Sequence, residues 1–202
     1  MGYSILQYVL KEPAEGETVM SGNSVTDKLI TTIGKWQRPA DPDHKYIYVF
    51  DQYWSASRSL YDEVQKASWD DVILNDEMKK TVTELMQKFF DSEDIYKELG
   101  VQWKRGIILH GPAGNGKTIS IKALMHTLMK KYGDDIPSLY VKSAPQTYHI
   151  RSIFQQARYM APCLLIFEDI DTIVTPGTRS YFFNEVDGLG KARNFLLLSG
   201  YH

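Results

Sequence analysis

Residues Gly111-Pro112-Ala113-Gly114-Asn115-Gly116-Lys117-Thr118 form the stretch on which the expected fold of this chain depends. They stand between a short apolar run, Ile107–His110, and a segment whose apolar residues have helical spacing, Lys117–Lys131. The stretch matches G-x-x-x-x-G-K-S/T, the pattern of a loop that joins a strand to a helix and surrounds phosphate groups. Glycine allows such a loop to curl with its N–H groups facing inward, and the helix presents its positive end to the bound anion.

Two side chains of this loop have chemistry of their own. The Lys117 ammonium is expected to reach the β- and γ-phosphates of a nucleoside triphosphate, and the Thr118 hydroxyl is expected to ligate a magnesium ion. We therefore expect ATP and Mg²⁺ as the cofactors of this chain.

A second apolar run, Cys163–Phe167, ends in the acidic residues Glu168, Asp169 and Asp171. The run has the composition of a strand buried on both faces, and open α/β sheets bind their ligands beyond the carboxyl ends of such strands. Glu168 and Asp169 are therefore candidates to support the metal and to activate the attacking water. Acids after a strand are equally compatible with a solvated turn or a helix cap. The P-loop upstream favours the catalytic interpretation for the first two, whereas Asp171 is expected to cap the next turn.

Strand-like and helix-like segments alternate through the second half of the chain. Strands are expected over Ile107–His110, Ser138–Val141, Cys163–Phe167 and Phe195–Ser199. Helices are expected after a cap at Asn75 or Asp76 and over Lys117–Lys131, Tyr148–Met160 and Thr178–Val186. The alternation implies right-handed crossovers. The fold class is therefore α/β, with a P-loop NTPase parallel sheet between flanking helices.

The first third of the chain differs in character from this core. We expect a small α+β N-terminal region at residues 1–67, and the core at residues 68–202. A helix is expected over Ser24–Trp36, and the β-branched and aromatic run Lys45–Phe50 is expected to form a strand that packs against it.

Composition narrows the function classes. The chain has 23 basic and 25 acidic residues and a net charge of −2, so no nucleic-acid partner is expected. No apolar run approaches the roughly 20 residues of a membrane span, so no membrane partner is expected either. Its single cysteine, Cys163, cannot form an internal disulfide. A cytoplasmic or nuclear location is the expectation, and a mitochondrial one is left open.

These segments together resemble the AAA ATPase family, from about Trp69 to the C-terminus. Beside the P-loop, the resemblance rests on Trp69–Leu74, on Tyr96–Gly106, and on Phe183–Gly188, which resembles the family's segment before the sensor-1 strand. Within the family the chain is most similar to a fungal group of ATPases and, more distantly, to the mitochondrial Bcs1 branch. No transmembrane segment of the Bcs1 kind is present in the sequence.

The resemblance implies a role for each site residue. It places adenine against Asp71, Val72 and Ile73, assigns metal support to Thr118 and Glu168, partly through water, and assigns water activation to Asp169. The family order is Asp then Glu, so the inverted order here leaves the division of labour between the two acids open. The remaining nucleotide contacts that it implies are Gly111, Pro112, Ala113, Gly114, Asn115, Gly116, Lys117 and Ile119.

The resemblance also implies an incomplete AAA large subdomain. The arginine fingers, the last core strand and the helical lid would lie beyond His202, so Ile107–His110 is expected to be an edge strand. For the complete protein we expect a homo-hexamer that couples ATP hydrolysis to the remodelling of a protein substrate or adaptor, and for this chain no stable ring. The alternative is a nucleotide-binding module or regulatory fragment with little turnover. A small-molecule kinase fits less well, since no phosphate-clamping lid is evident.

Overall fold

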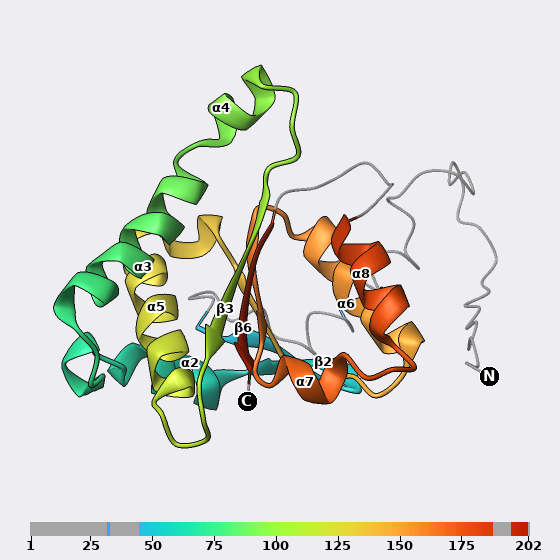
Figure 1. Ribbon diagram of the computed structural model, residues 1–202, viewed down its shortest axis with the longest axis horizontal. Helices are drawn as coiled ribbons and strands as arrows, with labels where there is room; N and C mark the ends of the chain where they lie inside the picture. The colour runs from blue at the N-terminus through green and yellow to red at the C-terminus, as the bar shows by residue number, and fades with distance from the viewer. Residues whose placement is uncertain (1–31, 33–44, 188–194, 202) are drawn as a thin grey trace. The chain divides into compact units, whose positions relative to one another are not determined.

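The computed structural model describes residue 32, residues 45–187 and residues 195–201. Apart from Thr32, the helix expected over Ser24–Trp36 lies outside the described residues. Within them, a six-stranded sheet in the order β2-β1-β4-β5-β6-β3 has helices on both faces (Figure 1). The strands are β1 (Ile47–Asp51), β2 (Tyr53–Ser57), β3 (Lys104–His110), β4 (Ser138–Ser143), β5 (Cys163–Phe167) and β6 (Phe195–Tyr201). Every pair is parallel except β1 with β2, which confirms the predicted α/β class.

The helices form two groups (Figure 1). One face of the sheet carries α2 (Arg58–Lys66), α3 (Asp76–Phe90) and α5 (Lys117–Tyr132); the other carries α6 (Thr147–Tyr159), α7 (Ile170–Ile173) and α8 (Arg179–Asp187). The short elements η1 (Trp69–Asp71), α4 (Glu93–Glu98) and η2 (Gly133–Asp135) connect them. Of the two predicted caps for α3, Asn75 is the one used, because its side chain accepts the N–H of Glu77 at 2.8 Å. Among the described residues no helix has both the length and the apolar character that a membrane span needs.

The central strand β5 is buried on both faces of the sheet. All five residues of β5 are fully buried. Leu164 and Ile166 belong to the core cluster that includes residues of α5, and Leu165 and Phe167 belong to the cluster that includes residues of α6. Cys163 lies in the second cluster, where burial raises the pKa of its thiol to about 12. The sequence-based interpretation of this run as a doubly buried strand is confirmed.

The P-loop strand β3 lies at the end of the sheet. Among the described strands it pairs with β6 alone, in line with the edge position that the resemblance implies. Its Ile108 side chain is 61% exposed, in contrast to the buried residues of β5.

The N-terminal boundary differs from the expected one. Residues 45–67 were expected to belong to a separate N-terminal region, but β1 pairs in parallel with β4, and β2 extends the sheet by one more strand. The compact unit that contains the sheet therefore begins at Lys45 rather than near residue 68. The physical reason is that β1 has apolar side chains on both faces, with Ile47 and Val49 in one core cluster and Phe50 in the other.

Candidate nucleotide-binding site

The P-loop connects the end of β3 to the start of α5. Gly114 and Gly116 both have φ of 76°, in the left-handed region that glycine adopts without the strain of a Cβ atom. Gly116 is the residue before α5, and its carbonyl oxygen accepts both the N–H and the hydroxyl of Ser120 at 2.9 Å. The loop thus turns directly into the first turn of α5, where backbone N–H groups without a helical partner can bind an anion.

The Lys117 side chain folds back onto this loop. Its Nζ donates to the carbonyl oxygens of Gly111 at 2.6 Å and Pro112 at 2.9 Å, and only 9% of the residue is exposed. A buried ammonium held by loop carbonyls is close to the N–H groups that would receive phosphate. The ammonium therefore lies against the loop, and its contact with phosphate stays a prediction.

The two acids follow β5 directly. The N–H of Glu168 donates to the carbonyl of Val141 at 3.1 Å, which extends the β4–β5 ladder by one residue. Asp169 stands at the start of α7, and its carbonyl oxygen accepts the N–H of Thr172 at 3.1 Å and the hydroxyl of Thr172 at 2.8 Å. Both acids are half-buried at the carboxyl end of the sheet.

Gly200 on β6 lies between the lysine and the first acid. A Cβ atom placed on Gly200 would stand 2.5 Å from the carbonyl oxygen of Glu168 and 3.9 Å from Cε of Lys117. The structure therefore brings these two predicted site residues to one glycine. Sequence analysis missed this role of Gly200, although a glycine inside a strand is a known signal of close backbone approach.

Tyr140 is a second residue that sequence analysis missed. It is 1% exposed on β4, where it pairs with Ile166, two residues before Glu168. Burial first, and then the negative charges of Glu168, Asp169 and Glu63, raise the pKa of the Tyr140 hydroxyl far above its usual value. The hydroxyl consequently keeps its proton. The signal in the sequence was a tyrosine in an otherwise apolar strand, whose hydroxyl needs a partner when it is buried.

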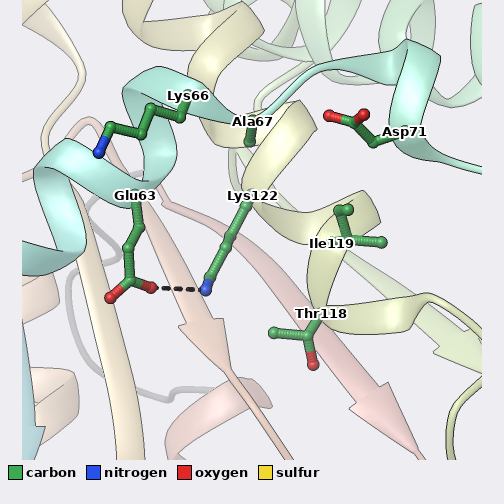
Figure 2. Close-up of a pocket in the computed structure, with 7 residues that line it drawn as sticks. All are labelled: Glu63, Lys66, Ala67, Asp71, Thr118, Ile119 and Lys122. Atoms are coloured by element: carbon green, nitrogen blue, oxygen red, sulfur yellow. Dashed lines mark hydrogen bonds and ion pairs between the residues drawn. The ribbon is translucent and has the colours of Figure 1, made fainter.

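A pocket of about 430 Å³ opens beside the P-loop (Figure 2). Its lining residues come from α2, the turn after it, η1 and the first turns of α5: Glu63, Lys66, Ala67, Asp71, Thr118, Ile119 and Lys122. Three of the expected nucleotide contacts therefore share one pocket: Asp71, Thr118 and Ile119. Sequence analysis did not anticipate that α2 forms a wall of it.

The other two expected adenine contacts lie elsewhere. Val72 is only 3% exposed, whereas the Ile73 side chain is fully exposed, and neither of them lines the pocket. The backbone of Val72 is also engaged, because its N–H donates to Trp69 at 3.2 Å and its carbonyl accepts from Leu74 at 3.0 Å.

The donor set suits magnesium. A hydroxyl from Thr118 and carboxylates from Glu168 and Asp169 offer the oxygen ligands that this ion prefers. In the part of the chain that the structure describes, no group of three or more acidic, histidine or cysteine side chains could hold a metal ion. Thr118 with one of the two acids would supply the one or two protein ligands that Mg²⁺ commonly takes together with phosphate and water.

Comparisons with known proteins agree with this geometry. Residues 107–199 match the family model described as ATPase family associated with various cellular activities (AAA). The chain is 27% identical over 159 residues to the ATPase family gene 2 protein of Saccharomyces cerevisiae, covering 72% of this chain and 20% of that protein. It is 26% identical over 160 residues to the cell division cycle protein 48 homolog of Archaeoglobus fulgidus, covering 72% of this chain and 22% of that protein.

A plant relative matches this chain over a segment of similar length. The chain is 30% identical over 158 residues to the cell division control protein 48 homolog C of Arabidopsis thaliana, covering 71% of this chain and 19% of that protein. The chain thus spans about a fifth of the length of these curated relatives. The matched segment contains the P-loop, both acids and most of β6. Residues 107–199 of this chain belong to the AAA family of ATPases.

Proposed function

We propose that this chain binds ATP with Mg²⁺ and that the complete protein hydrolyses the bound ATP. The observation that carries the proposal is the convergence of the P-loop lysine and the acid after β5 on one glycine of β6. Family membership supports the same reaction class.

Each residue has a role in this proposal. The N–H groups of the P-loop and of the first turn of α5 would hold the β- and γ-phosphates, and Lys117 would exchange its carbonyl partners for phosphate oxygens. Thr118 and Glu168 would hold Mg²⁺, partly through water, and the ion would neutralise charge on the phosphate oxygens. Asp169 would orient the attacking water and accept its proton.

The nucleoside is assigned to the pocket beside α5. Asp71 and Ile119 line this pocket and would contact adenine, and Ile73 offers an exposed apolar side chain two residues after Asp71. Val72 would support these contacts from beneath, since its side chain is buried and its backbone is already bonded.

The coupling of hydrolysis to work on a protein partner belongs to the same proposal. A homo-hexamer that remodels a protein substrate or adaptor is what the resemblance to the AAA family implies for the complete protein, and membership of residues 107–199 in that family supports it. The alternative is a nucleotide-binding module with little turnover, and a phosphate-release assay on the complete protein separates the two.

Calorimetric titration of ATP and Mg²⁺ into the chain tests the binding step. Lys117→Ala removes the ammonium that faces the phosphates and should abolish measurable binding while leaving the circular dichroism unchanged. Lys88→Ala is the matched control, because Lys88 lies on the exposed side of α3, where its ammonium pairs with Glu84 at 3.3 Å. Equal affinity in wild type and Lys117→Ala would refute the assignment of the phosphate site.

A further inference from the structure

The register between β4 and β5 places Tyr140 next to the acid at the end of β5. Tyr140 pairs with Ile166, and both side chains belong to the core cluster on the α5 side. Side chains two residues apart on a strand project from the same face, so Glu168 follows Ile166 on that face. Tyr140 and Glu168 are therefore diagonal neighbours, a distance that an aromatic side chain can reach.

The Tyr140 hydroxyl has the properties of a fixed donor. The residue is 1% exposed within a close-packed cluster, so its ring has little freedom to turn away from the site. A buried tyrosine hydroxyl normally finds a hydrogen-bond partner, and the register makes the Glu168 carboxylate the acceptor that the Tyr140 ring can reach. The backbone beside it is fixed as well, since the N–H of Glu168 is bonded to Val141 at 3.1 Å.

We propose that Tyr140 is a positioning residue for Glu168 and thereby sets the affinity of the site for Mg²⁺. In this proposal the hydroxyl donates to one oxygen of the Glu168 carboxylate and leaves the other oxygen available to the metal. A carboxylate held in this way loses less conformational freedom when the metal binds. Removing a hydrogen-bond partner of a metal ligand commonly lowers metal affinity on the order of 10- to 100-fold. The inference rests on the proposed function, because it needs Glu168 to face the metal.

The test separates the affinity for the nucleotide alone from the increase in nucleotide affinity that Mg²⁺ provides. ADP is titrated calorimetrically into the 202-residue chain, once in EDTA and once in saturating Mg²⁺. Tyr140→Phe keeps the ring in the core and removes only the hydroxyl. Tyr132→Phe is the matched control, because the Tyr132 hydroxyl also donates to a carboxylate, that of Asp91 at 2.7 Å, on the far end of α5.

We expect Tyr140→Phe to bind ADP as wild type does in EDTA and to lose about 10-fold or more of the gain that Mg²⁺ provides. Tyr132→Phe should match wild type in both conditions. In a Glu168→Gln background, Tyr140→Phe should have no further effect, since the hydroxyl acts through that carboxylate.

Other results would overturn the inference. An unchanged Mg²⁺ gain in Tyr140→Phe would show that the hydroxyl does not act on the metal. Equal losses in EDTA and in Mg²⁺, or an unfolded variant by circular dichroism, would make Tyr140 a structural residue only. Failure of the proposed function looks different, since wild type itself would then show no ADP binding in either condition.

Discussion

Nζ of Lys122 lies 2.7 Å from Oε2 of Glu63, so an ion pair joins α2 to the helix that begins at the P-loop (Figure 2). A second contact, between Nδ1 of His126 and the carbonyl oxygen of Ala67 at 2.7 Å, lies one turn further along α5. The lysine lowers the pKa of Glu63, chiefly through the hydrogen bond. The wall that α2 provides to the pocket beside the P-loop is thus held by polar contacts to α5.

Glu63→Gln removes the charge of this pair and should lower the free energy of unfolding by less than about 1 kcal/mol, because Glu63 is half exposed. Screening predicts that the difference from wild type disappears at about 1 M salt. Thermal melts at low and high salt measure it. Glu84→Gln is the control on α3, and a loss that persists at high salt would mean that packing of α2, and not charge, is affected.

The two acids after β5 should separate metal binding from chemistry in the complete protein. Glu168→Gln should weaken the Mg²⁺-dependent part of ATP binding, because it removes a metal-facing charge. Asp169→Asn should keep ATP bound and lose turnover, because an amide cannot accept the proton of water. Titration and phosphate release measure the two effects, and the reverse pattern would exchange the two roles.

Gly200→Ala should disturb the site from β6, the strand next to β5. The new methyl group would meet the carbonyl oxygen of Glu168 at 2.5 Å, so β6 or the Glu168 backbone must move. Overpacking of this kind costs about 1–3 kcal/mol, and nucleotide affinity should fall with stability. Gly106→Ala on β3 is the control, because no atom lies within 4 Å of the added carbon. Equal melting temperatures for the two variants would contradict the close approach.

The pH dependence of stability should include a contribution from Asp91. Its carboxylate accepts from Lys131 and from Tyr132, both at 2.7 Å, and these hydrogen bonds lower the pKa of Asp91. A depressed folded-state pKa stabilises the fold above the unfolded value of about 3.9. The contribution is lost as the pH falls through the folded-state pKa.

Asp91→Asn should therefore melt below wild type at neutral pH, by less than about 1 kcal/mol because the pair is half exposed. The two melting temperatures should converge in acid. Asp62→Asn is the comparison, since its contact with Arg58 is longer, at 3.5 Å. A difference that stays constant down to the lowest pH would refute the assignment.

The parts of the fold that sequence predicted are those with a strong local signal. The doubly apolar run of β5, the cap at Asn75 and the P-loop between β3 and α5 were all assigned from neighbouring residues. Helix α2 was missed because only Leu60 and Val64 are buried in an otherwise polar segment. The pairing of β1 with β4 was missed because contacts between distant segments leave no periodic pattern in the chain.

The same distinction holds for the site. Lys117 and the acids were predicted from motif spacing, whereas Tyr140 and Gly200 drew attention only through their position on neighbouring strands. A tyrosine in an apolar strand resembles a core residue until the register shows which residues of the next strand lie beside it. Such supporting residues become visible only when the sheet is assembled.

The placement of β1 between β2 and β4 has a mechanical consequence. Tension applied to the chain at Lys45 would act along β1 and would load the hydrogen bonds of both neighbouring ladders together, not one after another. From β4 the load passes to β5, whose last residue precedes Glu168. Force spectroscopy with handles at residues 45 and 110 would record this as a high shear resistance.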